Sequence, residues 1–342
     1  MNTLIYRFWI VMIAVSALVV SSCNKEMHEN DQLQQTIRLS VDVPITKATI
    51  FDTPASLNNS EVGGGDFAVY ARMTGDTSND GEMYMSNVRV NYFRDADDWR
   101  FANADGIFID YFWPLIEKLD FFGHFPLNPA DGAVTNVTYT KDAGPLFKFD
   151  LPLNSSGQEG LHEFLYSFVQ DKGLEEGNPA VEMNFSHPYA AVSFNLGQSY
   201  RMTLHDITLT DICHKGQYQF NRESSQWELT IESDESDKQP LEIDIEKDVP
   251  SRINFNSPIG GPYLVAPQDL SADSKLRVSF TRLDTQQETI EKSLQELGIT
   301  KWEAGKHYVY TLNMGNTEEE ILFKVQVDQW ESIPYKNVIE VQ

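Results

Sequence analysis

Cysteine is scarce in this chain: Cys23 and Cys213 are the only two in 342 residues. If Cys23 carries another modification, Cys213 has no cysteine left in the chain with which to form a disulfide. The stability of the fold must then come from packing. Hydrophobic residues make up 41% of the chain and aromatic residues 12%, which is enough to build substantial cores.

Positive charge is scarce as well. The chain has 26 lysines and arginines against 51 aspartates and glutamates, a formal net charge of −25. Proteins that bind nucleic acid need a basic surface for the phosphates, so we expect no nucleic-acid partner. A strongly acidic chain is suited to remaining soluble on an exposed surface.

The apolar run near the N-terminus is short. It occupies only residues 8–20 (FWIVMIAVSALVV), whereas a membrane-spanning helix needs about 20 apolar residues. Arg7 precedes the run, and the small residues Ser21 and Ser22 follow it. This order of charge, short apolar core and small residues is typical of a secretory signal peptide.

The end of the run, Val20-Ser21-Ser22-Cys23, resembles a bacterial lipobox. In a lipobox the cysteine thiol is acylated and becomes the first residue after cleavage, and two or three acyl chains anchor a protein stably in a membrane. We therefore predict a lipoprotein signal peptide over residues 1–22 and lipidation of Cys23. An ordinary signal peptide with an incidental cysteine, or a buried helix, are the alternatives.

Residues 24–35 (NKEMHENDQLQQ) are polar and contain no β-branched or aromatic residue. Such a composition is typical of a flexible segment, so residues 23–35 are predicted to form an acylated tether. Lys25-Glu26, with Glu29 and Asp31 behind it, resembles the acidic surface-export signal of Bacteroidota lipoproteins, although Met27 interrupts it. Display on the outer face of the outer membrane and retention in the periplasm both remain open.

The rest of the chain shows the period-two alternation of half-buried strands. In Thr36–Val43 the apolar residues Ile37, Leu39, Val41 and Val43 alternate with polar ones. Similar segments occur at 66–73, 87–93, 118–125, 146–151, 201–210, 241–246, 275–283, 307–314 and 320–328. Many short strands separated by Gly- and Pro-containing turns predict an all-β fold of β-sandwiches.

Three details of this pattern lead to separate predictions. Residues 201–213 switch face between Leu204 and Ile207, which predicts a bulge. Residues 286–297 fit either a helix or a strand followed by a loop. The polar stretch 171–179 (DKGLEEGNP) marks a domain boundary, giving an N-terminal sandwich over 36–174 and a C-terminal one over 175–342.

Motifs of enzymes are weak or absent in the sequence. The Gly63–Gly65 turn lacks the Lys-Ser/Thr of a phosphate loop, and there is no Gly-x-Ser-x-Gly elbow. The only metal-like cluster has spacing that fits no common zinc motif; its members are His205, Asp211, Cys213 and His214. We expect no enzyme activity, no cofactor and no metal.

Clustered aromatic residues suggest one alternative function. Trp99, Tyr111-Phe112-Trp113 and Phe121-Phe122 could form a platform for a sugar ring, as in surface glycan-binding lipoproteins. Such residues more commonly form the core of a sandwich.

A series of short motifs, in order along nearly the whole chain, resembles the fimbrillin family of type V pili, the surface fibre subunits of Bacteroidota. After the lipobox, the motifs are VPITKAT (43–49), FAVYA (67–71), YMSNVRVNY (84–92) with Trp99, FWP (112–114), KLDFFGHFP (118–126), EFLYS (163–167), FSHPYAAVSF (185–194), YLVAPQ (263–268), WEAGKHYVYTL (302–312) and VQVDQW (325–330). One departure is Pro188, where family members often carry alanine; it should only shift the start of a strand.

The resemblance implies two transthyretin-like β-sandwich domains in tandem and a precursor whose first strand is removed by proteolysis. Thr36–Val43 has the alternation to fill an edge groove, and an added strand would restore its backbone pairing. Lys47 is the only Lys or Arg between Arg38 and Arg72, so a trypsin-like protease would cleave between Lys47 and Ala48. A solvated Lys47 and a retained strand, as in an anchor or cap subunit, are the alternative.

The replacement strand would come from the chain end of another subunit, residues 331–342 (ESIPYKNVIEVQ), in which Ile339 and Val341 share one face. A final strand paired within its own domain is the alternative. The expected function is a structural subunit of a surface fimbria that supports adhesion. Its partners would be other fimbrial subunits, the outer membrane through the lipid anchor, and a host or bacterial surface ligand. An anchor or tip subunit, or a glycan-binding lipoprotein, are the other possibilities.

Overall fold

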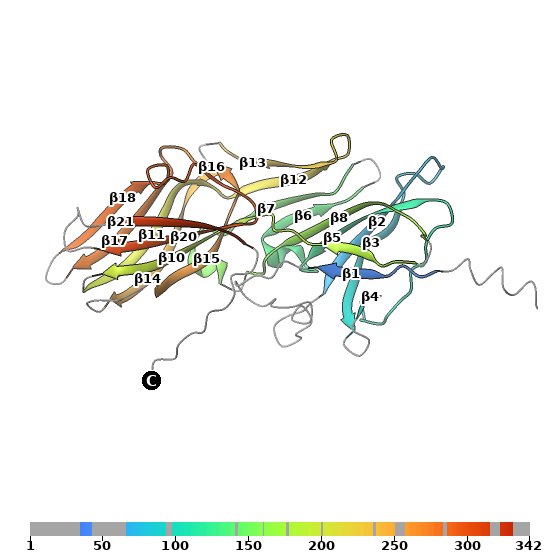
Figure 1. Ribbon diagram of the computed structural model, residues 1–342, viewed down its shortest axis with the longest axis horizontal. Helices are drawn as coiled ribbons and strands as arrows, with labels where there is room; N and C mark the ends of the chain where they lie inside the picture. Colours follow the sequence, from blue (N-terminus) through green and yellow to red (C-terminus); the bar gives the residue numbers. More distant parts are fainter. Residues whose placement is uncertain are drawn as a thin grey trace, which may run out of the picture.

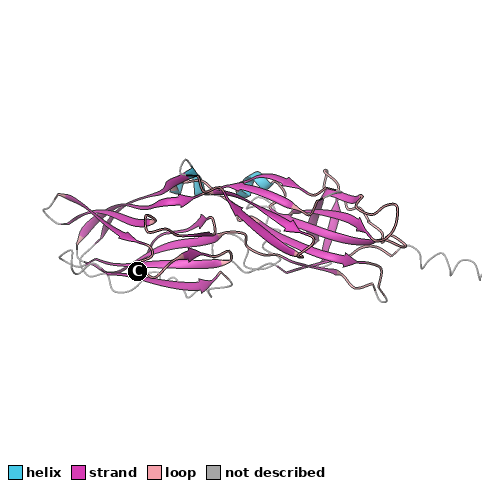
Figure 2. Ribbon diagram, turned by 90° about the horizontal axis from the view of Figure 1, so that it is seen from above, coloured by secondary structure: helices cyan, strands magenta, loops and turns pink. Residues whose placement is uncertain are grey.

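The computed structural model describes residues 35–42, 66–93, 98–140, 143–159, 161–175, 178–199, 201–234, 237–249, 257–282, 286–314 and 322–330. Over these residues the chain is almost entirely strand and turn, and the strands run along an elongated molecule (Figures 1 and 2). No helix in the described ranges is both long and apolar enough to cross a membrane.

The elements of the first half are β1 (Leu39–Asp42), β2 (Phe67–Thr74), β3 (Met83–Phe93), β4 (Asp98–Ala102), β5 (Lys118–Phe125), the 3-10 helix η3 (Pro129–Gly132), β6 (Val134–Thr138), β7 (Leu146–Asp150), α3 (Ser155–Gln158), β8 (Leu165–Lys172) and β9 (Val181–Asn184). Those of the second half are β10 (Ala190–Ser199), β11 (Met202–Cys213), β12 (Lys215–Asn221), β13 (Gln226–Ile231), β14 (Lys238–Val249), β15 (Ser257–Val265), β16 (Gln268–Asp269), β17 (Lys275–Arg282), β18 (Gln287–Ser293), β19 (Lys301–Trp302), β20 (Lys306–Met314) and β21 (Leu322–Gln329).

A seven-stranded sheet in the order β8-β5-β2-β3-β4-β1-β9 forms the first half of the molecule. Its two ends meet, because Tyr166 of β8 and Ser186, just after β9, form an antiparallel bridge with N···O distances of 3.1 and 2.8 Å. Alternation along each strand sends one set of side chains inward. In β5, for example, Leu119 and Phe121 face the enclosed core, whereas Phe122 faces the opposite side.

A four-stranded sheet in the order β13-β12-β7-β6 packs on that outer side. Its core contains Phe122, Phe147 and Phe164, with Trp227 of β13 packed against them. The pairing of β7 with β12 joins strands from the two halves of the sequence. The same core includes Tyr189, Leu264 and Trp330, so this middle sheet connects the first half of the molecule to the second.

The second half is a sandwich of two four-stranded sheets, β15-β10-β20-β21 and β14-β11-β17-β18. The apolar faces of the two sheets share one core that includes Phe194, Phe280 and Tyr310. Within the first of these sheets, β10 and β20 run parallel to each other.

The all-β sandwich architecture predicted from the alternation is confirmed, and each predicted segment overlaps a strand within the described residues. The bulge is confirmed as well, because the pairing of β11 shifts register between Leu204 and Asp206 against both β14 and β17. Residues 287–293 form a strand followed by a turn, the second of the two options. Strand β10 begins at Ala190, after Pro188.

The domain limits 36–174 and 175–342 stay a prediction. Strands on the two sides of residue 175 nevertheless pair with each other. Strands β9 and β12 both follow residue 175, yet they pair with β1 and β7, which precede it. Strand pairing therefore crosses 171–179 among the described residues, and alternation along a strand could not predict it because alternation does not reveal which strand lies beside it.

Candidate functional site

The predicted removable strand lies inside the seven-stranded sheet, not at its edge. Leu39 of β1 pairs antiparallel with Trp99 of β4. On its other side β1 runs parallel to β9, from Leu39↔Val181 to Asp42↔Asn184. The structure thus corrects the expected edge groove: β9 supplies the outer strand, and β1, drawn in blue next to β4 in Figure 1, fills a slot with backbone partners on both sides.

The side chains of β1 and the residues before it complete the enclosed core. Ile37 is 4% exposed and Leu39 is 6% exposed, whereas Arg38 and Ser40 between them face solvent. Val41 is partly buried against the same cluster. The prediction that these residues present one apolar face is confirmed for Ile37, Leu39 and Val41.

The slot that receives them is lined by aromatic and aliphatic side chains of four segments. Trp99 of β4 stacks edge-on against Phe67 of β2 with 5.2 Å between ring centroids. Trp113, which follows β4 in the chain, and Val181 and Met183 of β9 complete this part of the cluster. Without β1 these apolar surfaces would face water, which is unfavourable in proportion to their area.

Backbone hydrogen bonds also hold the segment before β1. Ile37 N–H donates to the Tyr111 carbonyl (2.7 Å), and Trp113 N–H donates to the Gln35 carbonyl (3.0 Å). From the other side, Val181 N–H donates to the Arg38 carbonyl (2.8 Å). The slot therefore offers both main-chain partners and an apolar floor, the two features that recognition of an added strand requires.

Asn178 links the segment before β1 to the loop that carries Trp113. This residue was not identified from the sequence. Its side-chain Nδ2 donates to the Thr36 carbonyl (2.9 Å), and its Oδ1 accepts from the indole Nε1–H of Trp113 (2.8 Å). Its backbone carbonyl accepts a further hydrogen bond from the Arg38 guanidinium. Asn178 has a φ of 46°, in the left-handed region that asparagine tolerates. The Gly-Asn-Pro sequence at 177–179 is a turn signal that could have drawn attention to it.

Exposed apolar side chains lie on the loop that flanks the slot. Residues 103–117 connect β4 to β5 and include the Tyr111–Trp113 stretch that pairs with the first strand. Ile107, Leu115 and Ile116 on this loop are 63%, 67% and 79% exposed. An apolar cluster of this kind beside the slot suits a protein–protein contact.

At the other end of the chain, β21 pairs antiparallel with β20 at the edge of its sheet. Trp330, directly after β21, is buried, and its ring stacks on His187 with 4.6 Å between centroids and planes 4° apart. His187 Nδ1 in turn contacts the buried carboxylate of Glu163. These contacts hold Trp330 against the segment that precedes β10.

Several predicted site residues lie outside the described residues. They are the lipidation site Cys23, the cleavage pair Lys47 and Ala48, Val43 of the first strand, and Ile339 and Val341 of the chain end. The roles assigned to them stay predictions.

The metal-like cluster of the sequence does not converge. His205 lies beside Glu246 and Thr281, Asp211 beside Lys238, and His214 beside Asp150. Cys213 is buried at the end of β11. Over the part of the chain that the structure describes, no group of three or more His, Cys, Asp or Glu residues has a geometry that could hold a metal ion.

The proposed aromatic platform is mostly buried. Trp99, Trp113, Phe121 and Phe122 are core residues, and of the named aromatics Phe112 has an appreciable exposed fraction, 36%. The alternative of a sugar platform built from Trp99, Trp113 and the Phe121-Phe122 pair is therefore contradicted, and these rings lie in the cores, the commoner position for such residues.

The fold and the site define a two-sandwich β protein whose first strand is inserted into a sheet between two later strands. The chain belongs to the fimbrillin-like family, whose family model matches residues 53–330, and this confirms the resemblance noted in the sequence. The matched range begins after β1 and after Lys47.

Solved structures share the fold at low sequence identity. A fimbrial protein from Bacteroides vulgatus aligns with a TM-score of 0.60 at 18% identity, covering 86% of this chain and 99% of that protein. Putative cell adhesion proteins from Bacteroides ovatus and Bacteroides uniformis align with TM-scores of 0.51 and 0.50 at 15% and 13% identity, covering 87% and 86% of this chain and 98% and 99% of theirs. A comparison with curated proteins gives no match.

Proposed function

We propose that this protein is a structural subunit of a cell-surface fimbria, a type V pilus, that assembles by strand exchange and supports adhesion. Membership of the fimbrillin-like family supports a fimbrial role. The observation that carries the strand-exchange mechanism is the position of β1, a short strand with backbone partners on both sides and with Leu39 in the core.

In this proposal the protein is exported as a lipoprotein precursor anchored in the outer membrane through Cys23. Cleavage between Lys47 and Ala48 separates β1 from the rest of the chain. The chain end of a neighbouring subunit, with Ile339 and Val341 on one face, then enters the slot. Each backbone hydrogen bond that the new strand makes contributes roughly 0.5–1.5 kcal/mol, and burial of its apolar side chains contributes more.

The role of this subunit is non-enzymatic and depends on its partners. These are other fimbrial subunits, in a homo- or heteropolymer, and a ligand on a host or bacterial surface. Its place in the fibre, as stalk, anchor or tip, depends on whether β1 is removed and on whether a strand of another subunit then takes its place.

The test is to treat the purified protein with a trypsin-like protease and to look for detergent-resistant ladders on a gel. Lys47→Gln should block the cleavage and keep the protein monomeric. Deleting residues 337–342 should permit cleavage but abolish the ladder. Cleavage at Lys47 without any ladder would instead indicate an anchor or tip subunit, and a ladder that persists without the tail would exclude the tail as donor.

A further inference from the structure

A cavity of about 490 Å³ opens on the second half of the molecule, away from β1. Its walls come from the end of β11, from β13, from the start of β14, and from the β16–β19 pair. Several elements of different sheets thus contribute to one hollow, and its volume lies within the range of small-molecule sites in proteins.

Asp211 forms one wall of the cavity in an unfavourable backbone conformation. Its φ is 54°, in the left-handed region, at a place where the pairing of β11 with β14 shifts register between Leu209 and Ile212. Bulges and strained backbone conformations concentrate at functional sites. The strain is unfavourable for folding, and it persists where the surrounding contacts hold the residue in a position that function requires.

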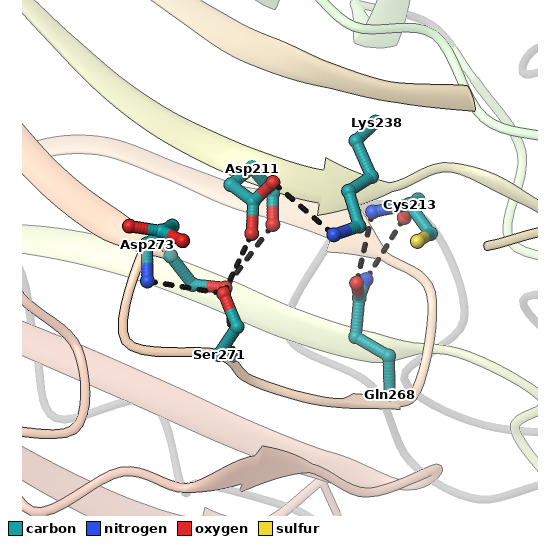
Figure 3. A network of polar contacts seen from close by, with 7 residues as sticks. Asp211, Cys213, Lys238, Gln268, Ser271 and Asp273 are labelled. Atoms are coloured by element: carbon teal, nitrogen blue, oxygen red, sulfur yellow. Dashed lines mark hydrogen bonds and ion pairs between the residues drawn. The ribbon is translucent and has the colours of Figure 1, made fainter. Parts of the chain in front are cut away.

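Polar contacts hold the Asp211 carboxylate in place (Figure 3). Ser271 Oγ donates to its Oδ2 (2.7 Å), and Lys238 Nζ lies 3.4 Å from its Oδ1. Ser274 Oγ also donates to the backbone carbonyl of Asp211 (3.1 Å). The carboxylate is therefore oriented before any ligand arrives.

The part of the lining next to Asp211, at Cys213 and Gln268, is equally fixed. The Gln268 amide accepts a hydrogen bond from Cys213 N–H (2.8 Å) and donates one to the Cys213 carbonyl (2.8 Å), so it pairs with β11 as a strand would (Figure 3). A cavity whose walls are tied in this way keeps its shape, and preorganisation lowers the cost of binding.

The lining defines the chemistry of the ligand. Asp211, Asp269, Lys238 and Lys301 are the charged residues of the lining. Both ammonium groups already have a carboxylate partner, because Lys238 pairs with Asp211 and Lys301 Nζ lies 2.6 Å from Glu303 Oε1, so neither is left to bind an anionic ligand. The hydroxyls of Ser271 and Ser274 and the Gln268 amide donate to protein oxygens, and their own oxygens can accept hydrogen bonds from ligand hydroxyls. Leu229, Ile231 and Pro267 supply an apolar side.

From this lining we propose that the cavity binds a neutral sugar residue. A sugar ring carries hydroxyls that both donate and accept around an apolar C–H face, and it has no net charge. The site would supply the ligand recognition of the adhesive role proposed above, and as an adhesive site it rests on that proposal.

The experiment uses the detergent-solubilised full-length protein and a panel of methyl glycosides of glucose, galactose, mannose and N-acetylglucosamine. Binding is measured by saturation-transfer NMR and by the shift of the assigned indole resonance of Trp302, which lines the cavity. At least one neutral glycoside should bind and shift this resonance. Glucuronic acid and glucosamine, of similar size but charged, should bind about tenfold more weakly or worse.

Variants locate the binding. Ile231→Trp should fill the cavity and abolish binding, and Asp211→Asn should weaken it about tenfold or more. Asp273→Asn is the matched control, because Asp273 lies in the same loop but its exposed side chain does not line the cavity. This variant should bind as the wild type does.

The inference is overturned if no neutral glycoside binds at about 10 mM, if a charged sugar binds best, if the Trp302 resonance does not move, or if Ile231→Trp binds normally. Fibre assembly is scored separately. A ladder formed by Ile231→Trp chains shows that the strand-exchange proposal stands whether or not the cavity binds sugar.

Discussion

Asn178 is the residue that ties the inserted first strand to both walls of its slot. It contacts the Thr36 carbonyl, the Trp113 indole and the Arg38 guanidinium at once. Truncating it removes two side-chain hydrogen bonds and leaves the indole N–H of a buried tryptophan without its partner.

For Asn178→Ala we expect a loss of about 1–3 kcal/mol in the free energy of unfolding, the usual cost of a buried polar group left unsatisfied. Urea titration followed by circular dichroism measures it. Asn128→Ala is the control, since the exposed Asn128 side chain donates its hydrogen bond to Asp131 in the same turn (2.8 Å). Equal effects of the two substitutions would mean that Asn178 does not hold the strand.

His124 makes the stability of the first half depend on pH. The ring is 1% exposed and packs against Phe164 with 5.5 Å between centroids. Burial lowers the pKa of His124 from 6.5 to about 4, although the contact with the Pro126 carbonyl opposes the shift. Below pH 6.5 the unfolded chain takes up a proton on His124, whereas the folded chain does not until the pH reaches about 4. Protonation therefore stabilises the unfolded state, and the stability that the neutral, buried His124 gives the fold above pH 6.5 is lost as the pH falls toward 4.

Between pH 7 and pH 4 the wild type should lose roughly 3 kcal/mol more stability than His124→Phe, which cannot take up the proton. Unfolding free energies of both proteins across this range supply the comparison. Parallel pH profiles would show that His124 does not carry the effect.

Among the elements, β1 shows what alternation can and cannot predict. The alternation of apolar and polar residues predicted which residues of the first strand face a core, and Ile37 and Leu39 are buried as predicted. The neighbours of β1 could not be predicted, because its parallel partner β9 begins at Val181, far away in the sequence. Nothing in a single strand encodes such a long-range partner.

If the slot can be emptied and refilled, a synthetic peptide of residues 36–43 (TIRLSVDV) should bind the protease-cleaved protein and suppress ladder formation. A peptide with Ile37 and Leu39 replaced by aspartate is the control, since it keeps the backbone donors but cannot enter an apolar slot. Ladders that are equally insensitive to both peptides would contradict a refillable slot.

At the scale of the whole molecule, the middle sheet connects the two halves. Besides the β7–β12 pairing, Arg222 after β12 lies with its Nη2 2.7 Å from Oδ2 of the fully buried Asp120 in β5. Burial raises the pKa of Asp120, against the opposing effect of a hydrogen bond from the Asp171 N–H and of Arg222. Composition indicated a boundary near 171–179, but hydrophobic patterning could not show that a later hairpin packs on the earlier sheet.

Cleavage within 171–179 should therefore leave the two fragments associated. They should elute together in native gel filtration and separate only in denaturant, because a shared sheet and core hold them. Fragments that separate in native buffer would show that the middle sheet does not bind the halves together.

The site itself was predictable only in part. The motifs indicated a fimbrial chain and a first strand with one apolar face, whereas Asn178 and the cavity beside Asp211 come from loops and strand ends that meet only in the folded chain. Loop residues of this kind follow no period, so their contacts depend on the tertiary structure.

The central claim, that the first strand is removed so that another can take its place, is tested most directly by mass spectrometry of the subunit recovered from assembled fibres. We predict that the mature chain begins at Ala48 and that residues 23–47, with β1, are absent from it. Fibres built from chains that still begin at an acylated Cys23 would contradict the account.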